Sequence, residues 1–312
     1  MPEALVTAAP PVASRRGRGP RRRLTPWLFL LPFGVLFVGF VLGPALYGIW
    51  VSLHDYDYLL PHQPWNGLGN YQSLFDPSSR DYSDFWRSMR ATGIFTVASV
   101  PFLVVIPLLI ALLLNRRFPG RTFFRAVFFA PYVLGVAVVG VLFRFLLDPN
   151  IGMLNYYLGR LGIAHNIPWT TQVPWAWISL VGMTVWWTLG FNAIIFLAGL
   201  QDISPEYYEA AQVDGASTWQ RFVHVTLPGL RPVLLFVLTM TILASANVFG
   251  QPFLVTQGAP ANETRSAIMY IANVGMSQYR QGAAAAMSYL LAAILIGISL
   301  LNFRLFRSQE ES

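Results

Sequence analysis

The residues best placed to act on another molecule lie in the stretch 202–228, where charge returns after a long apolar run. Its four carboxylates are Asp202, Glu206, Glu209 and Asp214. A carboxylate accepts strong hydrogen bonds from the arginine side chains of a partner. Anionic lipid headgroups would repel this acidic run, which favours docking to a protein over an ordinary amphipathic interfacial helix. The stretch is therefore predicted to contact a soluble protein.

A second set of candidates is uncharged and lies inside two later apolar runs. The set consists of Thr184, Trp187, Thr188, Phe191, Thr241, Ser245, Asn247 and Gln251. Helical spacing places most members of each run on one face, and hydroxyls, amides and aromatic rings are the groups that bind sugars. Packing between helices is the alternative. It is favoured for Trp187 and for each single Thr or Ser, whereas a role in solute binding is favoured for Asn247.

Several kinds of chemistry are excluded by composition. Cysteine is absent, so the chain has no thiolate nucleophile and no thiolate metal ligand. All 21 basic residues are arginine, which excludes a phosphate-binding loop that ends in Gly-Lys-Ser/Thr. The four histidines lack the spacing of metal ligands, and no nucleophile lies beside a base. We therefore predict no catalytic residue, no metal site and no cofactor on this chain, and any ATP and Mg²⁺ must be bound by another chain.

The elements that position these residues are predicted to be membrane helices. The chain is 55% hydrophobic and only 11% charged, with a mean hydropathy of +0.51, which is typical of membrane proteins. Six apolar runs approach or exceed the ~20 residues that cross a hydrocarbon core. They span about 27–53, 89–115, 123–147, 174–200, 232–253 and 283–306. The predicted fold class is all-α, a polytopic membrane protein with six transmembrane helices in a domain spanning 25–307.

Arginine placement predicts the orientation of the chain. With the N-terminus inside, 14 arginines fall on the inner side and seven on the outer side, in agreement with the positive-inside rule. Residues 1–24 form a predicted disordered basic tail, and residues 308–312 form a second tail, both cytoplasmic. The basic tail lies directly before an apolar run, so lipid headgroups are its expected partners and nucleic acid is not. A bacterial inner membrane is the predicted location.

The acidic stretch then lies on the cytoplasmic side, between the fourth and fifth runs. Ser204 can cap a first helix, and Gly215 breaks that helix or lets another backbone approach closely. Ser217 or Thr218 can cap a second helix, which Leu227-Pro228 is expected to end. The predicted element is a helix, a glycine and a second helix.

The same stretch resembles the Glu-Ala-Ala loop of ABC importer permeases. The matching residues are Glu209, Ala210, Ala211, Asp214, Gly215, Ala216, Phe222, Leu227 and Pro228. The resemblance implies that residues 205–227 form a coupling helix seated in a cleft of a cytoplasmic ATPase. Glu209 and the glycine six residues later would then transmit motion between the two proteins.

Other motifs extend the resemblance over about residues 25–307. They are Trp65-Asn66-Gly67-Leu68-Gly69-Asn70-Tyr71, Phe129-Ala130-Pro131-Tyr132 and Thr256-Gln257-Gly258-Ala259-Pro260. They resemble the carbohydrate-uptake permeases of the maltose/glycerol-phosphate type, and specifically the first permease of such a pair. The last motif departs slightly from the family's usual Gly-Gly-Pro.

The resemblance implies an importer subunit that moves a di- or oligosaccharide by alternating access. The implied partners are a second homologous permease, two ATPase subunits and an extracytoplasmic solute-binding protein. A glycerol phosphoester stays open as the solute. A secondary carrier would need ionisable groups in mid-membrane, which the runs lack. A membrane-embedded enzyme would need a carboxylate cluster, and only the pair Asp55 and Asp57 comes close.

Overall fold

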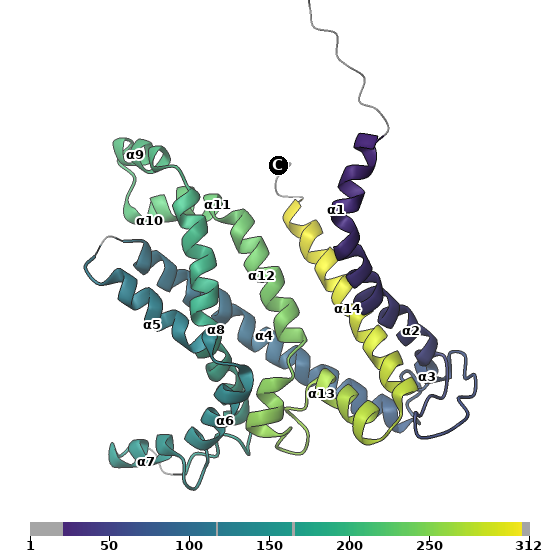
Figure 1. Cartoon of the computed structure of the whole chain (residues 1–312). Helices are drawn as coiled ribbons and strands as arrows, with labels where there is room; N and C mark the ends of the chain where they lie inside the picture. Colours follow the sequence, from purple (N-terminus) through teal and green to yellow (C-terminus); the bar gives the residue numbers. More distant parts are fainter. Residues whose placement is uncertain (1–20, 117, 164–165, 308–312) are drawn as a thin grey trace, which may run out of the picture. The chain divides into compact units, whose positions relative to one another are not determined.

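The computed structural model describes residues 21–116, 118–163 and 166–307, and its regular structure is helical apart from one isolated β-bridge between His54 and Trp65 (Figure 1). The predicted all-α fold class is confirmed. The chain divides into two compact units, Met1–Trp50 and Val51–Ser312, which are described in turn.

The first unit contains α1 (Arg21–Phe37), the π-helical turn η1 (Val38–Leu42) and most of α2 (Gly43–Ser52). Its apolar stretch Pro26–Ser52 has 27 residues and a mean hydropathy of 2.2, enough to cross a membrane. The helix begins four residues inside the expected basic tail, because arginine is a good helix former that readily extends an adjoining helix. The rest of that tail, and residues 308–312, lie outside the described residues.

Three helices of the second unit are long and apolar without a break. They are α4 (Arg80–Asn115), α8 (Trp175–Asp202) and α14 (Gln281–Arg307), and each contains a stretch that could cross a membrane. They correspond to the second, fourth and sixth apolar runs. α4 begins nine residues earlier than expected because Ser79 caps it by accepting a hydrogen bond from the backbone N–H of Asp81 at 3.1 Å.

Two further apolar segments are bent. The helices α5 (Arg121–Val133) and α6 (Val136–Leu146) meet at 93°, and Thr218–Gly229 meets α12 (Arg231–Ala246) at 68°. The expected single helix over 123–147 is therefore wrong. Pro131 removes a backbone donor near the bend, and Gly135 adopts an extended conformation. Among the described residues the membrane-crossing helices number four, or six if each bent pair is one span, so the six-span count stays a prediction.

The fifth run also ends earlier than expected. α12 stops at Ala246, where the side chain of Asn247 donates to the carbonyl of Leu243 at 2.8 Å. The π-helical turn η3 (Pro252–Thr256) follows. Shorter elements between the long helices include α3 (Gly69–Gln72), α7 (Met153–Arg160), α13 (Ala267–Ala272) and the π-helical turn η4 (Asn273–Ser277).

The centre of the second unit is α4, which packs against α8, α12 and α13, while α5 packs against α8 (Figure 1). One buried cluster joins α4, α8 and α12 through Leu108, Ala111, Leu114, Phe196, Leu197, Leu200, Leu230 and Val237. A second cluster consists of Phe95, Val139, Leu180, Met183, Val248 and Val255. Both clusters include residues of α4 and α8, which together form the scaffold of this unit.

Pro107 interrupts the backbone hydrogen bonding of α4, and a side chain of a neighbouring helix compensates for the loss. A proline has no N–H, so the carbonyl of Leu103 one turn earlier loses its usual helical partner. The Nδ2 of Asn192 on α8 donates to this carbonyl at 2.9 Å, and both residues are buried. A neighbouring helix thus satisfies the carbonyl that the proline frees, which is how membrane helices tolerate internal prolines.

The early start of α4 supplies two carboxylates to ion pairs at its first turns. Asp81, whose side chain is 4% exposed, accepts hydrogen bonds at 2.8 and 2.6 Å from the two terminal nitrogens of Arg280. Asp84 binds Arg265 at 2.8 Å. The Asp81 pair raises the pKa of Arg280 further above its ordinary value. These bridges tie α4 to the segment on both sides of α13.

A third carboxylate, that of Glu263, joins the same two regions through two ion pairs. Glu263 lies between Arg87 and Arg90, at 3.0 and 2.7 Å. Partial burial of Glu263 opposes its ionisation, but the hydrogen bonds from Arg90 and Arg87 outweigh this effect and lower the pKa of the carboxyl. The four pairs are not expected from the sequence, because the predicted second apolar run begins only at about residue 89.

Candidate functional site

A cavity of about 450 Å³ brings the uncharged candidates together. Its lining includes all eight of them: Thr184, Trp187, Thr188, Phe191, Thr241, Ser245, Asn247 and Gln251. Residues of α4, of the α5–α6 bend and of the segment after α12 complete the wall. Two stretches that lie 50 residues or more apart in sequence therefore face one space.

The hydroxyl protons of the two threonines on α8 are already donated in hydrogen bonds to backbone carbonyls. Thr184 Oγ1 donates to the carbonyl of Leu180 at 2.7 Å, and Thr188 Oγ1 donates to the carbonyl of Thr184 at 2.8 Å. A hydroxyl has one proton and two lone pairs. Each of these threonines can therefore offer a solute only an acceptor, unless its rotamer changes.

The polar groups at α12 differ in availability. Ser245 Oγ lies 3.2 Å from Ser99 Oγ and links α12 to α4, which is the packing role considered for it. Thr241 is buried. Asn247 is exposed, and only its Nδ2 takes part in a hydrogen bond. The side-chain amide of Gln251, which also lines the cavity, has no hydrogen bond within the described residues. The Asn247 carbonyl oxygen and the Gln251 amide are the groups most available to a bound molecule.

Aromatic side chains form another part of the cavity lining. Tyr132 stacks on Phe191 with ring centroids 4.6 Å apart and planes at 19°, and Trp187 lies 6.1 Å from Tyr132. Trp187 Nε1 donates to the carbonyl of Leu134 at 2.8 Å, at the bend between α5 and α6. This tie gives Trp187 the packing role that sequence reasoning favoured.

Sequence reasoning missed two polar residues of the lining, Tyr132 and Asn192. Tyr132 belongs to a motif that carried the family resemblance, but its motif gave no sign that it faces Phe191. Asn192 directly follows Phe191, and its pairing with a proline-freed carbonyl could have been found from the presence of Pro107. No lining residue is Asp, Glu, Arg or His, so the cavity suits an uncharged polar molecule.

The charged candidates of the stretch 202–228 lie on a helix, a glycine turn and a second helix. α9 (Pro205–Val213) begins at Ser204, whose Oγ accepts from the N–H of Glu206 at 3.4 Å. Gly215 then has φ +77°, which favours glycine. α10 (Thr218–Arg221) begins with a capping box in which Ser217 and Gln220 exchange hydrogen bonds.

The second arm continues further than expected. The π-helical turn η2 (Phe222–Thr226) and α11 (Leu227–Gly229) follow α10 directly. The expected end at Leu227-Pro228 is one residue short, because the helical backbone runs through Pro228 to Gly229 before the chain bends by 68° into α12. Tyr208 and Thr226 share a hydrogen bond of 3.0 Å that joins the two arms.

The surface of this segment is open. Glu209, Ala210, Asp214, Gly215, Leu227 and Pro228 are exposed, and Ala211, Ala216 and Phe222 are half-buried. Within the part of the chain that the structure describes, Glu209 and Asp214 form no ion pair. The carboxylates and the small alanines are thus free to meet another protein.

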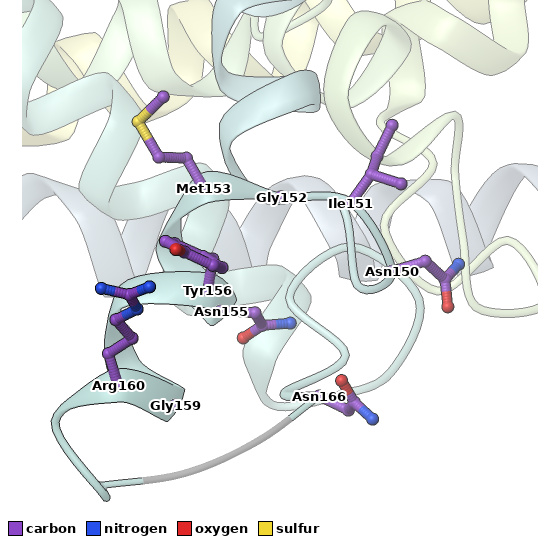
Figure 2. A pocket seen from close by; sticks show the side chains of 9 residues that line it. All are labelled: Asn150, Ile151, Gly152, Met153, Asn155, Tyr156, Gly159, Arg160 and Asn166. Atoms are coloured by element: carbon purple, nitrogen blue, oxygen red, sulfur yellow. The ribbon is translucent and has the colours of Figure 1, made fainter.

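A separate pocket of about 700 Å³ lies in the loop region around α7 (Figure 2). Arg160 lies over the ring of Tyr156 at 5.2 Å. Asn155 donates to the carbonyls of Pro149 and Ile167, both at 3.0 Å, and accepts from Trp169 Nε1 at 2.8 Å. Asn155 therefore ties the loop together, and its amide has little capacity left for a ligand.

Comparison with known proteins gives this geometry a context. Residues 80–310 match the family model described as the binding-protein-dependent transport system inner membrane component. The chain is 34% identical over 300 residues to y4oQ, a probable ABC transporter permease protein of Sinorhizobium fredii, covering 95% of this chain and 94% of that one. It is 32% identical over 294 residues to the lactose transport system permease protein LacF of Rhizobium radiobacter, covering 91% and 94%.

A solved structure agrees with the sequence matches. A bacterial ABC transporter involved in the import of the acidic polysaccharide alginate contains a chain with a TM-score of 0.79 and 25% identity, covering 92% of this chain and 96% of that one. The long apolar helices suit the membrane location that the family description states. The chain is a transport subunit and not an enzyme, and it belongs to the family of binding-protein-dependent transport system inner membrane components.

Proposed function

We propose that this chain is the permease subunit of an ATP-driven ABC importer, and that an uncharged di- or oligosaccharide passes through its cavity. One observation carries the proposal: two distant sets of hydroxyl, amide and aromatic side chains line the same uncharged space. The volume of about 450 Å³ lies within the range of small-molecule sites, roughly 300–1,000 Å³. The names of the lactose and alginate relatives support a sugar as the solute.

The lining also weighs against the other candidates. A glycerol phosphoester carries a negative charge, and a site for it would be expected to supply an arginine or lysine. A secondary carrier would need a titratable group on the solute pathway. No residue of the cavity lining meets either need. A phosphoester solute and a secondary carrier are therefore less favoured than an importer of an uncharged sugar.

Energy for transport would come from partner chains. We place ATP and Mg²⁺ on two cytoplasmic ATPase subunits, one of which docks on residues 205–227. Both termini of this chain would also lie on the cytoplasmic side. A second homologous permease would supply the other half of the pathway, and an extracytoplasmic binding protein would deliver the solute. Closure of the ATPases would move the two arms joined by Tyr208 and Thr226 and so alternate the access of the cavity.

Two substitutions test the coupling role. Glu209→Ala removes an exposed carboxylate, and Gly215→Val strains a turn at φ +77° that a branched residue adopts at a cost of about 1–3 kcal/mol. Both should leave membrane insertion intact and uncouple ATP hydrolysis from uptake in proteoliposomes. The matched control is Gly162→Val, at φ +70° in the outer loop with similarly open space. Unchanged uptake in both coupling variants would contradict the role.

The cavity is tested by Asn247→Ala, which removes an available carbonyl oxygen without touching the buried core. Uptake of labelled neutral disaccharides and oligosaccharides should show a changed KM or rate, with normal assembly. The control is Asn150→Ala, an exposed amide in the separate outer pocket. If the two variants gave the same uptake curve as the unsubstituted chain, Asn247 would be a packing residue only.

A further inference from the structure

We propose that an anionic phospholipid binds in a groove between the end of α4 and the arm formed by α10 and η2. The groove has a volume of about 930 Å³. Its defining residues are Leu109, Leu112, Leu113, Arg116, Trp219 and Arg221. This site is distinct from the cavity proposed for the solute, with which it shares no lining residue.

Charge at the mouth of the groove favours an anion. Arg116 and Arg221 both line it, and no lining residue is Asp or Glu. The Nε of Arg221 is buried and has no hydrogen-bond partner within the described residues, while its Nη2 has only a long contact of 3.5 Å to Thr218. A buried donor left unpaired is costly. A phosphate oxygen would satisfy it with a charge-assisted hydrogen bond.

The wall below the arginines favours an acyl chain. Leu109, Leu112 and Leu113 lie in the last turns of α4, the most apolar span of the chain, with a mean hydropathy of 2.8. Leu109 precedes Arg116 by seven residues, so the wall extends about 10 Å along the helix from the charged end. Leu109 and Leu113 are 57% and 51% exposed. A phosphate next to the arginines would therefore leave its acyl chains against leucine.

Trp219 marks the level of the membrane surface in this arrangement. Its side chain is 70% exposed and lies near Phe222, with ring centroids 5.5 Å apart. Tryptophan is enriched at headgroup depth, where its ring is amphipathic. An acidic loop of a soluble ATPase is the other possible occupant, but it would leave the leucine wall unfilled within the depth of the bilayer. The combination of cationic mouth and apolar wall matches a phospholipid better.

Native mass spectrometry of the purified complete transporter tests the proposal. Dioleoyl phosphatidylglycerol should be retained at concentrations at which dioleoyl phosphatidylcholine, with identical chains, is lost. The double variant Arg116→Gln and Arg221→Gln should weaken the phosphatidylglycerol affinity by about 10- to 30-fold, since each arginine near a membrane surface contributes on the order of tenfold or less. Arg304→Gln, at an exposed arginine near the end of α14, should change nothing.

Four results would overturn the proposal. The first is equal retention of the two lipids, and the second is an unchanged phosphatidylglycerol affinity in the double variant. The third is binding of soluble glycerol phosphate as tight as that of phosphatidylglycerol. The fourth is that the double variant loses the ATPase subunits while its lipid retention is unchanged. The last two would assign the groove to a free phosphate or to a protein. If the double variant fails to fold, two single variants replace it. Arg116→Gln, at an exposed residue, should lose part of the lipid preference, and the charge-conserving Arg221→Lys should keep most of it.

Discussion

The contact between α5 and α8 offers the sharpest test of the packing around the cavity. Gly190 on α8 lies so close to α5 that a Cβ built on it would meet the backbone of Phe128 and the Cα of Phe129, the latter at 2.5 Å. These are backbone atoms, so no side-chain rotation can relieve the overlap. Gly190 also precedes Phe191, which lines the cavity. The substitution Gly190→Ala should therefore separate the two helices.

The cost follows from the required movement. Carbon atoms pack at about 3.5–4.0 Å, so a contact of 2.5 Å demands a separation of roughly 1 Å. Overpacking of this kind costs about 1–3 kcal/mol. Alanine also favours a helix over glycine by about 1 kcal/mol. Gly182 on the same helix has no atom within 4 Å of a built Cβ, so Gly182→Ala gains the propensity term without the overlap.

The difference between these two variants isolates the overlap. Thermal unfolding of the purified protein should give a Tm for Gly190→Ala that is about 2–12 °C below that of Gly182→Ala, at 2–4 °C per kcal/mol. Solute uptake should fall in the same variant, because the Phe191 side of the cavity moves. A Tm equal to or above that of Gly182→Ala would refute the close approach of α5 and α8.

Four further substitutions probe the second unit. Asn192→Leu leaves a buried carbonyl of α4 without a donor and should cost about 1–3 kcal/mol in thermal unfolding. Asp81→Asn weakens the bidentate pair with Arg280, whose half-exposed side chain limits the loss to about 1–2 kcal/mol. Arg80→Gln, at an exposed neighbour, should change stability by less than about 0.5 kcal/mol. Glu263→Gln should lower the Tm at pH 7. The difference should begin to shrink as the pH falls below about 4.5, the ordinary pKa of this carboxyl, and vanish below its lowered pKa in the folded state.

The sign of the Glu263 effect follows from its lowered pKa. A carboxyl with a lower pKa in the folded state stabilises that state above its unfolded pKa and loses this effect as the pH falls through the folded pKa. A difference from Glu263→Gln that grew toward acid pH would contradict the role of Arg87 and Arg90. Equal losses for Asp81→Asn and Arg80→Gln would contradict the buried ion pair, and a fully stable Asn192→Leu would show that the freed carbonyl needs no donor.

Sequence reasoning was most successful where one helix face or one local signal decided the structure. Thr184 and Thr188 could be placed on a shared face by counting residues. The turn at Gly215 could be predicted because few other residues adopt positive φ. Ser204 was correctly expected as a cap because its hydroxyl satisfies a free N–H at a helix start.

Features that depend on distant contacts were harder to find. The bend after Val133 arises where Trp187 of α8 holds the carbonyl of Leu134, and an apolar run alone does not contain that information. The early turns of α4 are rich in charge and lie before the predicted start of the second apolar run at about residue 89. Asp81 lies in a helix there and is held by Arg280, a residue 199 positions away. Polarity is a poor guide where ion pairs replace apolar packing.

Docking of residues 205–227 to an ATPase is the central claim, and photo-crosslinking measures this contact directly. The photoreactive amino acid p-benzoylphenylalanine replaces either Val213, which is 88% exposed at the end of α9, or Met276, which is 77% exposed in η4. Irradiation of cells with the intact transporter, followed by mass spectrometry of the adducts, should join position 213 to a nucleotide-binding subunit and position 276 to none. An ATPase adduct from position 276, or none from position 213 in an assembled transporter, would contradict the account.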